Sequence, residues 1–132
     1  MGVLARTIAV IDDDDRVLES LQNLLASCGY KAETYSSAEL FLTSGALSRA
    51  SCIITDVEMR RMSGLGLLQH VRSRQFDVPV IIVTGTSENS ETFYLDRGAN
   101  GFFRKPIDGD ALLTLINDLC CDARQAEDDI RS

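Results

Sequence analysis

The sequence contains no tryptophan, a single histidine and only two prolines, and it has no long apolar run. With nine glycines in 132 residues, the low proline content excludes collagen-like and low-complexity classes. Because a transmembrane helix needs about 18 or more consecutive apolar residues, we expect no membrane-spanning segment. We also expect no signal peptide, since the N-terminus carries one arginine and runs directly into a short apolar strand pattern.

Positive charge is also in short supply. Thirteen lysines and arginines stand against twenty aspartates and glutamates, which gives a net charge of −7. Contacts to nucleic-acid phosphates need clustered positive charge, so we expect no direct nucleic-acid binding by this domain. The apolar content of 45% and the charged content of 25% are ordinary for a folded globular protein.

A chain of 132 residues is expected to form one domain, because domains usually have roughly 100–200 residues. We predict a single cytoplasmic domain over 1–132, with a core over about 7–123. The remaining segment, DARQAEDDIRS from position 122, has few apolar residues and is expected to be a polar C-terminal tail.

Short apolar runs alternate with longer amphipathic stretches along the chain. Such runs are typical of strands buried in a parallel sheet, and we predict strands at 7–11, 30–35, 52–55, 78–83 and 101–103. Apolar residues at helical spacing predict a helix after each strand, at 17–28, 37–47, 64–71, 87–97 and 112–119. Ser37 and Ser63 are expected to start helices, and Gly29 and Gly98 are expected to close them.

Five strand–helix units in strict alternation predict a parallel sheet with helices on both faces. Right-handed crossovers leave few topologies for such a chain. We therefore predict an α/β fold of the flavodoxin-like (βα)5 type, a doubly wound parallel sheet with strand order 2-1-3-4-5.

Polar and charged side chains that can bind ligands or react follow four of the five predicted strands. Asp12 and Asp13 follow the first strand, Asp56 the third, Thr84 the fourth and Lys105 the fifth. Because ligands bind beyond the carboxyl ends of parallel strands, we expect these side chains to meet at one mouth. Carboxylates sharing a mouth raise one another's pKa unless a cation intervenes, and oxygen ligands of this kind suit Mg²⁺. With a lysine and a hydroxyl for phosphoryl oxygens, the set predicts phosphoryl transfer onto an aspartate.

The run of four aspartates after the first strand allows two registers for the acidic pair. The pair is either Asp12 with Asp13 or, after a slip of one residue, Asp13 with Asp14. We favour Asp12 and Asp13 because they directly follow Ile11, the last apolar residue of the strand.

Five motifs occur in order along the chain: VIDDDDRVLESL, SAELFL, TDVEMRRMSGLGLL, VIIVTG and GANGFFRKPI. As an ordered set they resemble the receiver domains of two-component response regulators, in particular the FixJ-like branch, over about 7–123. The resemblance implies a signalling domain rather than an enzyme, with slow autodephosphorylation as its own activity. Its phosphoryl group would come from a sensor histidine kinase or a phosphotransfer protein.

The resemblance also assigns roles at the mouth. It implies that Asp56 is the phosphoacceptor and that Mg²⁺ is bound directly by Asp13, by Asp56 and by the backbone carbonyl of Glu58. Asp12 would hold the metal through a water molecule.

The remaining roles concern the switch. By the resemblance, Thr84 hydrogen-bonds the phosphoryl group and Lys105 pairs with it. Phe102 matches the switch aromatic, which turns inward when Thr84 moves toward the phosphate. The face re-formed by this movement comprises the fourth helix, the fifth strand and the fifth helix, and it is a candidate surface for a homodimer. The Lys105–Pro106 peptide bond is expected to be cis.

One position departs from the receiver pattern. Receivers usually have a proline four residues after the phosphoacceptor, where this chain has Arg60, followed by Arg61. The loop therefore lacks a fixed φ angle and gains two cations near the mouth. We expect phosphorylation to survive, with altered loop mobility or altered recognition of the kinase.

Two other functions remain as alternatives. A haloacid-dehalogenase-like aspartate phosphohydrolase also uses Asp, Thr, Lys and Mg²⁺, but it needs a second aspartate where this chain has Glu58, and a cap domain. A phosphorylation-independent interaction module would keep the fold without the chemistry. The receiver interpretation itself leaves two arrangements open: a stand-alone protein, or a fragment of a regulator with a separate DNA-binding effector domain.

Overall fold

The structure is a computed structural model that describes residues 6–85 and 89–131, with side chains up to Cys120. Five parallel strands form one sheet in the order β2-β1-β3-β4-β5. Their bounds are β1 (Thr7–Ile11), β2 (Lys31–Tyr35), β3 (Cys52–Asp56), β4 (Val80–Thr84) and β5 (Gly101–Arg104). The predicted flavodoxin-like fold class and its strand order are confirmed.

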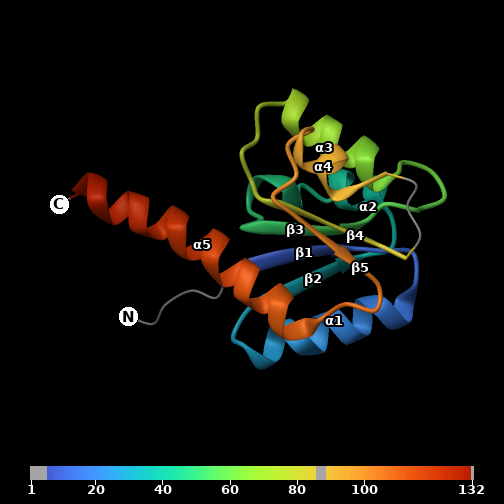
Figure 1. Ribbon diagram of the computed structural model, residues 1–132, viewed down its shortest axis with the longest axis horizontal. Coiled ribbons are helices and arrows are strands. Elements are labelled where there is room, and N and C mark those ends of the chain that lie inside the picture. The colour runs from blue at the N-terminus through green and yellow to red at the C-terminus, as the bar shows by residue number, and fades with distance from the viewer. Residues whose placement is uncertain (1–5, 86–88, 132) are drawn as a thin grey trace.

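Helices cover both faces of this sheet (Figure 1). α1 (Asp15–Ser27) and α5 (Gly109–Arg131) lie on one face, and α2 (Ala38–Thr43), α3 (Gly64–Ser73) and α4 (Glu91–Leu95) lie on the other. A 3₁₀ turn, η1 (Ala46–Ser48), follows α2. No helix within the described residues combines the length and the apolar content that crossing a bilayer demands.

Two apolar clusters, one on each face of the sheet, form the core. Successive side chains of a strand point to opposite faces, so Ile8 and Val10 pack against α1 and α5. Ala9 and Ile11 pack in the cluster that includes α2 and α3. Every residue of β3 and β4 is buried, which explains why the apolar runs of these strands have no polar alternation.

Local capping residues fix several helix ends where the sequence predicts them. The hydroxyl of Ser37 accepts the N–H of Leu40 at 3.1 Å, and that of Ser63 accepts the N–H of Gly66 at 3.0 Å. Gly29 and Gly98 follow the ends of α1 and α4 with φ angles of +86° and +104°, a conformation that favours glycine.

Some predicted bounds are wrong. α2 ends at Thr43 rather than near 47, because Gly45 with a φ angle of +80° interrupts the helix before η1. β4 begins at Val80 rather than 78, after Pro79, which has no N–H for the ladder. The sequence predicts the fourth helix over 87–97, of which Ser87 lies outside the described residues. The helix starts after its N-cap Ser90 and ends at Leu95.

The polar segment at the C-terminus continues a helix. The backbone of α5 is helical from Gly109 to Arg131, beyond the expected core limit near 123. Figure 1 shows this part of α5 projecting past the edge of the sheet. The polar tail is therefore a helical extension of α5.

Candidate functional site

The predicted site residues lie along the carboxyl edge of the sheet. Asp12 directly follows β1, Asp56 and Thr84 are the last residues of β3 and β4, and Lys105 directly follows β5. Because the strands are parallel and adjacent in the order 1-3-4-5, their ends deliver these side chains to one place.

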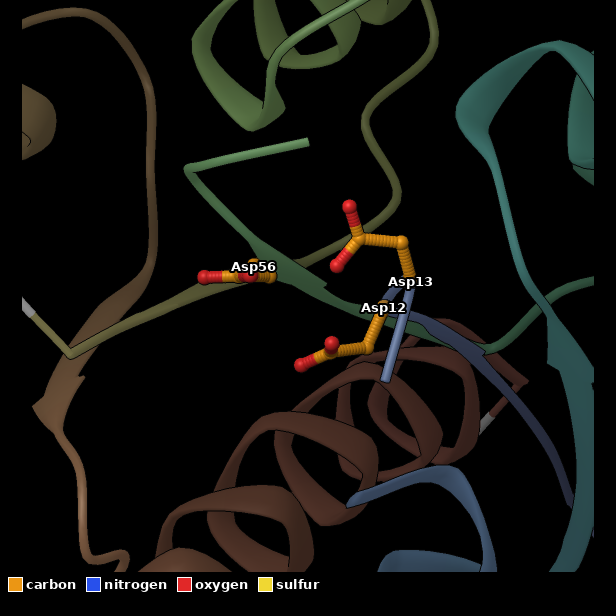
Figure 2. Close-up of side chains that lie close together, drawn as sticks. All are labelled: Asp12, Asp13 and Asp56. Atoms are coloured by element: carbon orange, nitrogen blue, oxygen red, sulfur yellow. The ribbon is translucent and has the colours of Figure 1, made fainter. Parts of the chain in front are cut away.

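Three carboxylates gather at the centre of this edge. Figure 2 shows Asp12 and Asp13 at the end of β1 beside Asp56 at the end of β3. One carboxylate oxygen from each of the three lies within 4.8 Å of the others. Asp12 and Asp56 are 2% and 6% exposed, whereas Asp13 is exposed. A cluster of three oxygen ligands, open on one side, can bind a metal ion.

Asp14 has a different role in the structure. It is the N-cap of α1, and its carboxylate accepts the backbone N–H of Arg16 at 2.9 Å. The backbone N–H of Asp14 itself donates to Oδ1 of Asp12 at 2.9 Å. This geometry favours Asp12 and Asp13, rather than Asp13 and Asp14, as the acidic pair at the mouth.

Lys105 forms ion pairs with two of these carboxylates. Its Nζ lies 3.0 Å from Oδ2 of Asp12 and 3.6 Å from Oδ2 of Asp56. Burial disfavours the charged ammonium, but the hydrogen bond and the charge of Asp12, with those of Asp56, outweigh it and raise the pKa of Lys105. The peptide bond between Lys105 and Pro106 is cis, as expected.

The carboxyl group of Asp56 is strongly perturbed. Burial and the neighbouring charge of Asp12 raise its pKa to about 6. The ammonium of Lys105 and a hydrogen bond from the backbone N–H of Glu58 act in the opposite direction. Asp56 is therefore ionised at neutral pH, but its charge is poorly compensated by the protein alone.

Two buried oxygens at the site have no hydrogen-bond partner among the described residues. They are Oδ1 of Asp56 and Oγ1 of Thr84. Most buried polar atoms in proteins have a hydrogen-bond partner. Buried oxygens without one at the carboxyl ends of strands therefore indicate a binding site for a ligand. Together with the carboxylate cluster, they fit a cation and a phosphoryl group, which would supply positive charge and acceptor oxygens.

Phe102 faces α4 from β5. Its ring stacks on that of Tyr94 from α4, with centroids 5.6 Å apart and an interplanar angle of 20°. The guanidinium of Arg104 lies 5.2 Å from the centre of the same ring. In the ladder Phe102 pairs with Ile82, two residues before Thr84, so the side chains of Phe102 and Thr84 are on the same face of the sheet. Sequence reasoning missed Tyr94, which is 1% exposed.

The backbone of Gly64 lies very close to the backbone of Asp56, the candidate phosphoacceptor. A Cβ atom at this position would overlap the backbone carbonyl of Asp56. The N–H of Gly64 donates to the carbonyl of Val57 at 2.9 Å, which closes the loop over residues 57–63. Sequence reasoning identified Gly64 only as a helix start, because a close approach of two backbones leaves no periodic signal.

Arg60 and Arg61 lie in this loop and are exposed. With Asp13, Ser36, Glu39 and others, they line a hollow of about 400 Å³ beside the carboxylate cluster. Glu58, also exposed, is on the same loop two residues after Asp56. The loop thus places charges of both signs next to the site.

A family model described as the response regulator receiver domain matches residues 8–117 of the chain. The chain is 38% identical over 110 residues to the transcriptional regulatory protein FixJ of Azorhizobium caulinodans, covering 83% of this chain and 52% of that protein. It is 35% identical over 117 residues to the response regulator protein TodT of Pseudomonas putida, covering 88% of this chain and 52% of that protein. The chain therefore spans about half the length of these curated relatives.

Solved structures show the same similarity. A crystal structure of a response regulator receiver domain protein from Clostridium thermocellum superposes with a TM-score of 0.83 and 28% sequence identity. The superposition covers 93% of this chain and 99% of that one.

Proposed function

The chain belongs to the response regulator receiver domain family, and on that premise we propose that Asp56 is its phosphoacceptor. Receiver domains act in two-component signalling, where they receive signals from histidine kinases. The observation that carries the proposal is the buried Oδ1 of Asp56 at the carboxyl edge of the sheet, which has no hydrogen-bond partner in the described part of the chain. Lys105 supplies a cationic group and the hydroxyl of Thr84 a hydrogen-bonding group at the same edge.

The reaction is the transfer of a phosphoryl group from a phosphohistidine of a sensor histidine kinase or phosphotransfer protein. A carboxylate oxygen of Asp56 forms the new O–P bond while the N–P bond of the donor breaks and leaves its electron pair on the imidazole nitrogen. The ammonium of Lys105 offsets the negative charge gathered at the site, and the hydroxyl of Thr84 donates to a phosphoryl oxygen.

Mg²⁺ is the cofactor that suits this site. Asp13, Asp56 and the backbone carbonyl of Glu58 would hold it directly, and Asp12 through a water molecule. The donor set supports this assignment, because it consists of oxygens and leaves coordination positions for water and phosphate. When bound, Mg²⁺ supplies positive charge that stabilises the transferring phosphoryl group.

Phosphorylation would act by changing the conformation of one surface of the domain. Movement of Thr84 toward the phosphoryl group would free space for Phe102, whose stacking on Tyr94 couples β5 to α4. The face formed by α4, β5 and α5 would then bind the output partner, with a homodimer as one candidate. Signalling occurs through protein contacts, in the cytoplasm, with no direct nucleic-acid binding by this domain. A DNA-binding effector elsewhere in a longer protein is compatible with relatives about twice as long.

The two alternative functions, a phosphohydrolase and an interaction module, differ in the support that they receive. The relatives found are response regulators, and they give no support to a haloacid-dehalogenase-like phosphohydrolase. Slow autodephosphorylation of Asp56 is the hydrolytic activity that we propose instead. A phosphorylation-independent interaction module stays the alternative outcome of the test below.

The test is intact-mass spectrometry after incubation with acetyl phosphate, with and without Mg²⁺. We expect one phosphoryl adduct on the wild type that requires Mg²⁺ and is absent from Asp56→Asn. Asp96→Asn, at the exposed end of α4, is the matched control and should behave as wild type. An adduct that persists in Asp56→Asn contradicts the proposal, and no adduct from acetyl phosphate or from a histidine kinase favours the interaction module.

A further inference from the structure

The loop over residues 57–63 controls what surrounds Asp56. It leaves the end of β3 and returns at Gly64, whose N–H donates to the carbonyl of Val57. The backbone N–H of Glu58, near its start, hydrogen-bonds the Asp56 carboxylate. A shift of this loop therefore changes both the hydrogen bonding of Asp56 and the position of the Glu58 carbonyl.

A side chain from a distant segment holds the loop. Oε2 of Glu39, in the first turn of α2, accepts the backbone N–H of Met62 at 3.1 Å, across 23 residues of chain. The other oxygen, Oε1, is buried and has no hydrogen-bond partner among the described residues. Glu39 is half-buried and lines a hollow together with Asp13 and Arg60. Its side chain therefore lies on the side of α2 that is next to the site.

The two arginines in the middle of the loop add few polar constraints to it. Arg60 and Arg61 are exposed, and neither forms an ion pair or donates a backbone hydrogen bond within the described part of the chain. Arg60 occupies a position where a proline would fix the φ angle of the backbone. The hydrogen bond from Met62 to Glu39 is therefore a polar tie on the middle of the loop, in addition to the packing of Met59 and Met62 against the apolar core.

We propose that Glu39 is a positioning residue for the phosphorylation site, which fixes the loop over residues 57–63 through the backbone N–H of Met62. Glu39 does not touch the reacting atoms; it acts through the loop that presents Glu58 to Asp56. The inference rests on the proposed function, since it concerns the same site. It predicts that loss of the Glu39 acceptor weakens Mg²⁺ binding and slows phosphorylation.

The test compares three variants by titration calorimetry with Mg²⁺ and by the rate of phosphorylation from acetyl phosphate. Glu39→Ala removes the acceptor, and we expect its Kd for Mg²⁺ to rise on the order of tenfold, as for other residues that orient metal ligands. Glu39→Gln keeps an acceptor oxygen for the Met62 N–H and should remain within about twofold of wild type. Glu33→Ala removes a partly buried carboxylate from β2 that pairs with Arg49, away from the loop, and is the control.

The outcomes separate the inference from the proposed function. If the wild type is phosphorylated but Glu39→Ala binds Mg²⁺ and reacts like Glu33→Ala, Glu39 is not a positioning residue. The inference is also overturned if Glu39→Gln is impaired as strongly as Glu39→Ala, because the hydrogen bond would then not be the cause. A wild type that binds Mg²⁺ and is never phosphorylated contradicts the proposed function, while the Mg²⁺ affinities of the variants still decide the role of Glu39.

Discussion

The Nζ atom of Lys105 lies 3.0 Å from Oδ2 of Asp12, and the two residues are 93 positions apart in the sequence. The strand order brings them together, because β1 and β5 end at the same edge of one parallel sheet. Lys105 also lies 3.6 Å from Asp56, so a single cation serves two buried carboxylates. This shared cation is the main charge compensation that the protein itself provides for the proposed phosphoacceptor.

Removal of that cation should raise the pKa of Asp56. Lys105→Met keeps the length of the side chain without its charge. The ionised carboxylate of Asp56 then loses a favourable interaction with the ammonium group. We expect an Asp56 pKa clearly above the wild-type value of about 6, measured by NMR titration of the carboxyl carbons without Mg²⁺. Arg104→Met removes a cation one residue away, whose guanidinium lies over Phe102, and should leave this pKa unchanged. Equal shifts in both variants would contradict the specific pairing of Lys105 with Asp56.

The raised pKa of Asp56 also predicts how stability depends on pH. Burial raises it from 3.8 to about 6, so the folded state binds this proton more tightly than the unfolded state does. The resulting stabilisation is complete below about pH 3.8 and is lost as the pH rises through about 6. Asp56→Asn, which carries no charge, should exceed the wild type in free energy of unfolding by up to about 3 kcal/mol at neutral pH.

This difference should shrink to near zero at about pH 4. Urea unfolding followed by circular dichroism, in the presence of EDTA, measures it for both proteins. Circular dichroism is the suitable signal because the chain has no tryptophan. A stability difference of the same size at both pH values would show that the ionisation of Asp56 is not its source.

Thr84 and Thr55 are two buried threonines whose substitution by valine should change the free energy of unfolding in different ways. The hydroxyl of Thr84 has no partner among the described residues, whereas that of Thr55 donates to the carbonyl of Asp56 at 3.0 Å. Thr84→Val should keep or raise the free energy of unfolding, and Thr55→Val should lower it by about 1–2 kcal/mol. Phosphorylation by acetyl phosphate should slow in Thr84→Val, since the phosphoryl group loses a donor. A Thr84→Val protein that is destabilised and phosphorylated normally would mean that Thr84 is structural.

Gly64 should tolerate no side chain. A Cβ atom there overlaps the backbone of Asp56, which cannot move without distorting β3, so Gly64→Ala should lower the free energy of unfolding by about 1–3 kcal/mol or more. At Gly66 the nearest atom to an added Cβ is in the flexible side chain of Met62, at 3.2 Å. Gly66→Ala, inside α3, is therefore the matched control and should be neutral or slightly stabilising. Urea unfolding of both variants checks this, and equal effects would argue against the close approach of Gly64 to Asp56.

Much of the fold was predictable because its strands are buried on both faces. The apolar runs of β1, β3 and β4 have no competing interpretation once each is followed by an amphipathic helix. Convergence of Asp12, Asp56 and Lys105 follows from the strand order alone. The helix bounds were harder to predict. α2 ends at Thr43, shortly before Gly45 with its positive φ angle, and α4 starts after Ser90, a local cap that periodicity does not reveal.

The contacts that refine the site could not be predicted from local pattern. The hydrogen bond between Glu39 and Met62, the approach of Gly64 to Asp56 and the stacking of Tyr94 on Phe102 all join separate elements. Each depends on the distance between elements after packing, which neither spacing nor composition encodes. The sequence leaves two registers open for the acidic pair, and the capping of α1 by Asp14 favours Asp12 with Asp13.

The central claim is that Asp56 carries the phosphoryl group, and chemical mapping of the modified residue tests it most directly. The protein is incubated with acetyl phosphate and Mg²⁺, reduced with sodium borohydride to convert an acyl phosphate to an alcohol, digested and sequenced by tandem mass spectrometry. The account predicts homoserine at position 56 and unmodified aspartate at positions 12 and 13. Homoserine at another carboxylate, or none in folded protein that binds Mg²⁺ and has been offered a phosphodonor, would contradict it.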